Sequence, residues 1–183
     1  MADVTGGEKD FNLYFVSEKT SGAELNTAFR KKWDWVISTS KQNALWYLTI
    51  ISNLHQSNQL PEAVTMDDVR DAITTGIKRS AIDCLKLITQ ASSKDLVDVV
   101  RIPARTLSRR EVFHPDESER ILRVAYAFQR AIEVFEALDK ARQWFAKPHR
   151  ALGGRTPLLF CDTEVGANEV MHLLGRIEQG VFS

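Results

Sequence analysis

The chain has 183 residues, of which 44% are hydrophobic and 26% charged, as in an ordinary globular protein with one sizeable core. Its 24 lysines and arginines balance its 24 aspartates and glutamates, so only a local basic patch, and not the overall charge, can attract nucleic acid. The apolar stretches are far shorter than the ~20 residues of a membrane span, and the first residues lack the features of a secretory signal peptide. We therefore expect a cytoplasmic protein without membrane contact.

Residue types that serve catalysis or metal binding do not cluster in the sequence. The four histidines are far apart, and Cys84 and Cys161 each lie in an apolar run, which predicts two buried, reduced thiols. No glycine-rich phosphate loop follows a predicted strand, and no serine or cysteine nucleophile motif stands out. We therefore expect neither an enzyme nor a protein that holds a metal or a cofactor.

Residues 1–65 are predicted to form an N-terminal extension. Its first part is rich in Gly, Ser, Thr, Glu and Lys, a composition typical of a flexible segment. From Asn26 onward, apolar residues such as Phe29 and Trp33 recur at helical spacing. The extension is therefore expected to be flexible at its start and helical afterwards.

Residues 66–118 predict several short helices. Gly76 interrupts the first helical block, and Ser80 is expected to cap the helix that follows. Another helix begins at Ser92 and ends before Pro103, because proline disfavours helical backbone in the residue before it. A second short helix follows from Ala104 to about residue 112. Two short helices joined by a tight turn give a helix-turn-helix outline.

The most regular predicted helix begins at His114 and Pro115. Its apolar residues step by four, three, four and three, a stripe that faces either the core or a partner helix. The members of this stripe are Ile121, Ala125, Phe128, Ile132 and Phe135.

The remaining sequence predicts three more helices. Asp139 is expected to cap a short helix that ends before Pro148, and Thr156 is expected to precede another. A last helix opens at residues 162–164 and is stopped by Gly180. The prediction is an all-α protein, with a helix-turn-helix domain over residues 66–118 and a small helical domain over residues 119–183.

Three groups of motifs, specific in their combined order and spacing, occupy the chain from about Ser80 onward. They are IPARTLSRR at residues 102–110; ESERILR at residues 117–123, continuing to residues 133–135; and residues 141–145, 148, 151–158, 162–167 and 174–183. On these motifs the chain resembles the Xre/MbcA/ParS-type antitoxins, whose partners are commonly RES-domain toxins. The resemblance implies an antitoxin of a type II toxin–antitoxin pair, with residues 119–183 as the toxin-binding domain. Arg101 departs from the family pattern, which often has a glycine in this turn.

The resemblance further implies where the toxin binds. The expected contacts are Gly153, Gly154, Arg155, Arg176, Glu178, Gly180, Val181, Phe182 and Ser183. Phe182 is the type of aromatic anchor that fills a partner's pocket. The terminal carboxylate of Ser183 is expected to mimic the pyrophosphate of the NAD that RES toxins bind. Two alternatives stay open: Val181 and Phe182 fold back onto the last helix, and the two glycines only shape their turn.

Residues 101–110 include the turn and most of the second short helix of the helix-turn-helix outline. They form a local basic patch, because they contain four arginines and no acid. Arg105 and Arg109 are four apart and share a helix face, while hydroxyl groups nearby add possible contacts to phosphates or bases. The expected DNA-binding residues are Arg101, Arg105, Thr106, Ser108, Arg109 and Arg110. Since such antitoxins often repress their own operon, operator DNA is an expected partner. The alternative is that these arginines are solvated or pair with acids such as Asp116, Glu117 and Glu119.

The leading hypothesis is therefore an antitoxin that blocks the active site of a RES-domain toxin and represses its own operon. A homodimer is expected, because helix-turn-helix proteins usually read two half-sites. The competing hypothesis is a stand-alone helix-turn-helix transcriptional regulator without a toxin partner. Such a regulator would not need residues 176–183, and a RES-type reading frame beside the gene would separate the two hypotheses.

Overall fold

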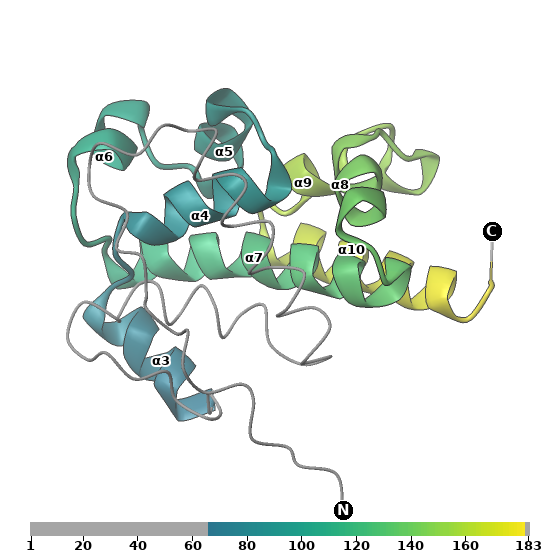
Figure 1. Ribbon diagram of the computed structural model, residues 1–183, viewed down its shortest axis with the longest axis horizontal. Helices are drawn as coiled ribbons and strands as arrows, with labels where there is room; N and C mark the ends of the chain where they lie inside the picture. Colours follow the sequence, from purple (N-terminus) through teal and green to yellow (C-terminus); the bar gives the residue numbers. More distant parts are fainter. Residues whose placement is uncertain (1–65, 182–183) are drawn as a thin grey trace, which may run out of the picture. The chain divides into compact units, whose positions relative to one another are not determined.

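The computed structural model describes residues 66–181, and within that range every regular element is a helix (Figure 1). The elements in chain order are α3 (Met66–Thr75), α4 (Ser80–Thr89), α5 (Ser93–Val100), α6 (Ala104–Arg109), α7 (Pro115–Phe135), α8 (Leu138–Ala146), the 3-10 turn η1 (Arg150–Leu152), α9 (Pro157–Phe160) and α10 (Glu164–Glu178). The predicted all-α fold is confirmed for this part of the chain. The predicted extension over residues 1–65 lies outside the described residues, as do Phe182 and Ser183.

Helix α7 is the element against which most of the others pack: α3, α4, α5, α8 and α10 all contact it. Four members of its apolar stripe are buried and the fifth, Phe135, is half-buried; the buried four are Ile121, Ala125, Phe128 and Ile132. Phe128 meets Phe145 of α8 edge to face, with ring centroids 5.1 Å apart. The stripe therefore packs within this chain and is not left free for a partner helix.

Short polar side chains and a proline begin several of these helices where the sequence predicts. The hydroxyl of Ser92 accepts a hydrogen bond from the backbone N–H of Asp95 at 3.0 Å, and Thr156 caps α9 in the same way. At the start of α7, Pro115 occupies the first turn, and the side chain of Glu117 accepts from the backbone N–H of His114 at 2.9 Å. These starts are therefore decided by local chemistry.

Two predicted caps are wrong. The residue before α4 is Arg79, and Ser80 is already the first helical residue. The residue before α8 is Ala137, and Asp139 lies inside the first turn, where its carboxylate accepts from Arg142 at 3.1 Å. Before α4, the backbone N–H of Arg79 bonds to the carbonyl oxygen of Glu111 at 2.9 Å, a contact between segments far apart in the sequence. Helix α8 starts directly after α7 ends at Glu136 in the left-handed conformation.

The two short helices α5 and α6 lie where the sequence places them, joined by a tight turn. Arg101 ends α5 with a left-handed φ of 53°, and Pro103 precedes α6. Helix α5 packs on both α7 and α9, and the predicted domain boundary at residue 118 falls inside α7. The division into two domains stays a prediction.

A buried serine connects the α3–α4 link to α7. The hydroxyl of Ser118 accepts a hydrogen bond from the backbone N–H of Ile77 at 2.9 Å and donates to the carbonyl oxygen of His114 at 2.8 Å. The side chain of Ser118 is fully buried. Its hydroxyl is therefore the partner of a backbone N–H that water cannot reach.

The Ser118→Ala variant is expected to lower the free energy of unfolding by about 1–3 kcal/mol, because it leaves the N–H of Ile77 buried without an acceptor. Urea unfolding followed by circular dichroism measures this change. Ser93→Ala, at an exposed serine of α5, is the control and should change stability little. Equal effects of the two substitutions would contradict the role assigned to Ser118.

Candidate functional site

The turn between η1 and α9 contains two glycines with positive φ, 63° at Gly153 and 79° at Gly154. Both N–H groups bond back to the preceding segment: Gly153 to the carbonyl of Arg150 at 3.0 Å and Gly154 to that of His149 at 2.9 Å. A Cβ atom built on either glycine meets nothing within 4 Å. The glycines are thus required by the backbone conformation, and the space in front of them is open.

Arg155 follows these glycines and is exposed. Its guanidinium lies over the ring of Phe160, 4.4 Å from the centroid, a cation–π contact between the turn and α9. The predicted toxin-binding residues 153–155 therefore form one ordered, solvent-facing turn.

Helix α10 ends at Glu178, and the predicted stop residue Gly180, two residues later, has a φ of 71°. The N–H of Val181 bonds to the carbonyl of Arg176 at 2.9 Å, and the N–H of Gly180 bonds to that of Ile177 at 3.0 Å. This pair of bonds is the Schellman motif, in which a left-handed residue turns the chain away from the helix axis. The side chain of Val181 emerges from the motif 51% exposed.

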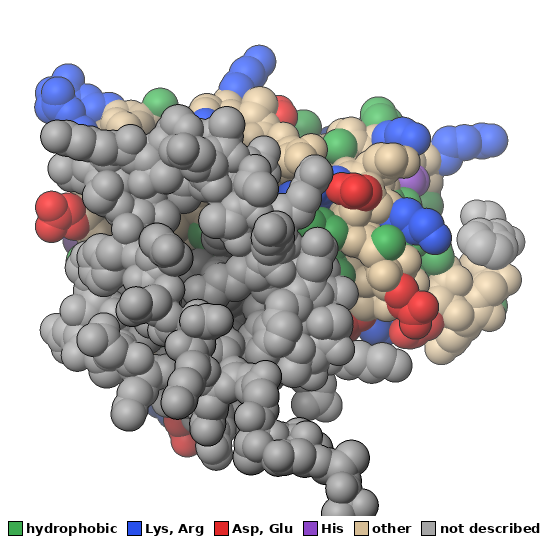
Figure 2. Space-filling view, in the orientation of Figure 1, with side chains coloured by type: hydrophobic (Ala, Val, Ile, Leu, Met, Phe, Trp, Pro, Cys, Tyr) green, Lys and Arg blue, Asp and Glu red, His purple; other side chains and the backbone are tan. Residues whose placement is uncertain are grey.

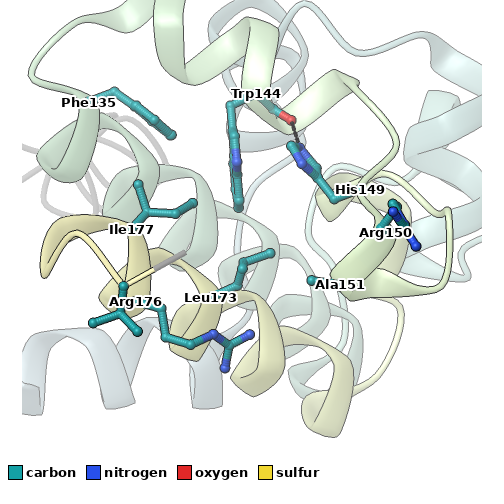
Figure 3. Close-up of a pocket in the computed structure, with 9 residues that line it drawn as sticks. Phe135, Trp144, His149, Arg150, Ala151, Leu173, Arg176 and Ile177 are labelled. Atoms are coloured by element: carbon teal, nitrogen blue, oxygen red, sulfur yellow. Dashed lines mark hydrogen bonds between the residues drawn. The ribbon is translucent and has the colours of Figure 1, made fainter. Parts of the chain in front are cut away.

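A surface hollow of about 660 Å³ lies between the end of α7, helix α8, η1 and the last turns of α10 (Figure 3). Its lining residues are Phe135, Trp144, His149, Arg150, Ala151, Leu173, Arg176, Ile177 and Val181. Two of the predicted toxin-binding residues, Arg176 and Val181, are among them. The predicted turn at residues 153–155 directly follows η1, which contributes Arg150 and Ala151.

An aromatic wall, formed by Phe135, Trp144 and His149, closes one side of the hollow (Figure 3). The ring of Trp144 lies between the other two, with centroids 5.6 Å from Phe135 and 4.9 Å from His149. The Nε2–H of His149 donates to the carbonyl oxygen of Trp144 at 2.9 Å. The wall is therefore fixed by contacts between tilted rings and by a hydrogen bond.

These aromatic residues are not among those that the sequence predicts for the site. Trp144 and Phe145 are adjacent on α8, so only one of them can face the core directly. Phe145 is the one that is buried, and Trp144 is half-buried. The adjacency of two aromatic residues indicates that one ring lies outside the core, but it does not indicate what that ring contacts.

The charged residues at the end of α10 already have partners within the chain. Arg176 pairs with Glu169 at 3.2 Å, and Glu178 pairs with Arg130 of α7. Glu178, predicted to contact the toxin, is thus also a link between α10 and α7. Arg150, on the rim of the hollow, is exposed and makes no ion pair with any residue from 66 to 181.

The predicted DNA-binding residues are divided by their contacts. Arg101 pairs with Asp162 at 2.9 Å and Arg110 pairs with Glu117, so the alternative of pairing with nearby acids holds for Arg110. Arg105 and Arg109 are exposed, and within the described range neither makes an ion pair. Figure 2 shows Lys and Arg side chains projecting where Figure 1 labels α6.

Two residues with hydroxyl side chains complete the set of predicted DNA-binding residues. Thr106 is half-buried, whereas Ser108 is exposed and its hydroxyl donates to the carbonyl of Arg105 at 3.1 Å. The α6 surface therefore offers two unpaired guanidinium groups and one exposed hydroxyl.

The two cysteines are buried, as predicted. Burial raises the pKa of Cys161 to about 12 and raises that of Cys84 as well, so both remain protonated thiols at neutral pH. Across residues 66–181 no three His, Cys, Asp or Glu side chains gather as metal ligands would. In the same range no helix is long and apolar enough to cross a membrane.

A sequence profile of the family described as the antitoxin Xre/MbcA/ParS C-terminal toxin-binding domain matches residues 130–180. This match contains the aromatic wall, the glycine turn and all of α10. Every residue that lines the hollow, apart from Val181, lies inside it.

Three curated proteins, each named Antitoxin Xre, are similar to the chain. The protein of Yersinia enterocolitica is 37% identical over 118 residues, which cover 62% of this chain and 80% of that protein. Those of Photorhabdus laumondii and Pseudomonas putida are 36% and 32% identical, over 61% and 66% of this chain and 78% and 77% of their own lengths. Their names agree with the prediction that the chain is not an enzyme. The chain belongs to the Xre/MbcA/ParS family and is the antitoxin of a toxin–antitoxin pair.

Proposed function

We propose that this antitoxin neutralises a RES-domain toxin by blocking its NAD-binding active site, and that it does so through the turn at residues 153–155 and the segment from Arg176 onward. The observation that carries the proposal is the Schellman end of α10. It turns the chain out of the helix and leaves Val181 exposed at the hollow's edge, one residue before Phe182. The family resemblance supports a RES-domain protein as the toxin.

The end of the chain after α10 offers apolar side chains that a partner can cover. Val181 and the phenylalanine that follows it are apolar groups beyond the end of a helix, and exposing them to water is unfavourable by roughly 25 cal/mol per Å². A pocket on a partner would cover them. Aromatic side chains that fill such pockets are the usual anchors of protein interfaces.

Deleting residues 180–183 is expected to abolish neutralisation and leave the fold intact, because no residue from 180 onward that the structure describes is buried. The Phe182→Ala variant alone is expected to lose about 2 kcal/mol of binding. Growth of cells that express the toxin with each variant measures neutralisation, and circular dichroism checks folding.

Val165→Ala is the control for this experiment. Val165 is 80% exposed in the first turn of α10, at the other end of the helix, and its loss should not affect neutralisation. Full rescue of growth by the folded, truncated protein would overturn the proposed role of the tail.

We also infer that α5, the turn after it and α6 bind operator DNA and repress the antitoxin's own operon. The support is the pair of exposed arginines on one face of α6, Arg105 and Arg109, neither of which makes an ion pair among the described residues. Such groups are free to contact phosphates or base edges. Arg101 and Arg110 are held by acids, so they are expected to contribute less.

The double variant Arg105→Ala, Arg109→Ala is expected to abolish promoter binding and to leave toxin neutralisation unchanged. Binding by the wild type should also weaken steeply with salt, because phosphate contacts release counterions. Gel shifts at several salt concentrations measure both effects.

The matched control is Lys140→Ala with Lys147→Ala, which removes two exposed cations elsewhere on the chain. A double arginine variant that shifts promoter DNA as well as the wild type does would exclude α6 as the DNA-binding surface.

A homodimer remains part of this proposal, because two half-sites call for two copies of the motif. The α7 stripe is buried in the chain's own core, so the dimer must use another surface. Light scattering of the toxin-free protein at micromolar concentration should give twice the 20.7 kDa of one chain. A monomer mass would count against the dimer.

A further inference from the structure

The hollow at the end of α10 presents apolar surface that nothing in residues 66–181 fills. Its walls and floor combine the aromatic wall with Leu173 and Ile177 of α10. Its volume of about 660 Å³ lies in the range of sites that enclose a ligand or several side chains. Hollows of this size on a protein with a known binding role are candidates for the central part of an interface.

The hollow is also preformed. The hydrogen bond from His149 to the carbonyl of Trp144 fixes the wall, and the N–H of Leu152 bonds to the carbonyl of His149 at 3.0 Å to fix η1 beside it. Helix α10 packs against both α7 and η1, which holds the floor in place. A partner that enters the hollow therefore loses little free energy to ordering it.

The charges of the residues that line the hollow determine which chemical groups bind there. Its ionisable lining residues are Arg150, Arg176 and His149, and none of the acids that the structure describes lines it. Glu169 already neutralises Arg176, whereas Arg150 has no acidic partner among the described residues. A carboxylate arriving at the rim would complete that missing pair, with charge-assisted hydrogen bonds to the guanidinium.

The position of the hollow connects the two proposed contact segments. Arg150 and Ala151 lead directly into the glycine turn, and Val181 leads into the tail. A partner that covers both segments therefore also lies over the hollow. Figure 3 shows Arg150 and Ala151 on one side and Arg176 and Ile177 on the other.

We propose that the hollow is a second anchor site for the toxin, and that it receives an apolar side chain of the toxin with a carboxylate beside it. The apolar group packs between Trp144 and Leu173, and the carboxylate pairs with Arg150. This inference rests on the proposed toxin-binding function and adds the chemistry of the toxin surface. The contact is separate from the tail, which reaches into the toxin rather than receiving a group from it.

The test is to fill the hollow without disturbing the core. Ala151 is exposed and lines the hollow, so Ala151→Trp places a bulky ring there. Ala104→Trp is the matched control, because it makes the same change at an exposed alanine of α6 that does not line the hollow. Calorimetry with a catalytically inactive variant of the toxin encoded beside the gene measures the dissociation constant. We expect at least tenfold weaker binding for Ala151→Trp, no change for Ala104→Trp, and unchanged thermal melting for both.

A charge reversal tests the carboxylate. Arg150→Glu is expected to weaken binding at least tenfold at low salt and less at high salt, because salt screens the repulsion. Lys94→Glu, at an exposed cation of α5, makes the same change in charge away from the hollow and should have no effect. A loss that is equal for the two variants would overturn the pairing with Arg150.

A double-mutant cycle identifies the occupant. If a toxin group enters the hollow, the losses from Ala151→Trp and Phe182→Ala should add, because they remove separate contacts. If Ala151→Trp has no effect in the Phe182→Ala background, the antitoxin's own tail fills the hollow and the proposal is wrong. Wild-type affinity for Ala151→Trp would also overturn it while leaving the proposed function standing. A wild-type protein that fails to bind the toxin would overturn the proposed function itself.

Discussion

The burial of helix α7 is the constraint on which the rest of the described structure depends. Among residues 66–181, helices α3, α4, α5, α8 and α10 all pack against α7, and ten of its 21 residues are buried. A single amphipathic face would bury a narrower stripe, so α7 must be covered on several sides to keep its apolar residues from water. The helices of the DNA-binding proposal and those of the toxin-binding proposal are thus held by the same central element.

Arginine side chains donate hydrogen bonds to backbone carbonyls at the ends of several helices that lack a glycine there. The guanidinium of Arg142 donates to the carbonyl of Ile88 at 2.6 Å, that of Arg120 to Val100 at 2.8 Å and that of Arg79 to Ser108 at 2.7 Å. These acceptors lie at the carboxyl ends of α4, α5 and α6, where backbone carbonyls have no partner within the helix. These three arginines therefore serve helix ends within the chain.

Because arginines also have structural partners within the chain, a basic segment cannot be assigned to DNA binding as a whole. Of the four arginines at residues 101–110, two are held by carboxylates and two face solvent on α6. The α6 surface lies near the beginning of α7, whereas the hollow includes Phe135 at its end. A helix of 21 residues spans about 30 Å at ~1.5 Å per residue. The proposed DNA and toxin surfaces consequently lie toward opposite ends of α7.

Within residues 66–181, the sequence by itself determined the helices and most of their ends. Helical periodicity predicts α7 and α10, and side-chain hydroxyls, prolines and Gly180 set boundaries through hydrogen bonds that form within a few residues. The motifs also placed the chain in its family, because their order and spacing can be compared without coordinates. These features depend on residues only a few positions apart, so they can be predicted from the sequence without the tertiary structure.

Only the tertiary structure decided what each helix faces. The α7 stripe fitted both a core and a partner helix, and the packing of α8 and α10 made it core. The hollow joins residues from α7, α8, η1 and α10, so no local pattern could predict that Trp144 faces Leu173. The pairing of Arg101 with Asp162 likewise joins residues 61 positions apart. Which side chains meet depends on how the helices cross, and that is set by the burial of the whole apolar surface at once.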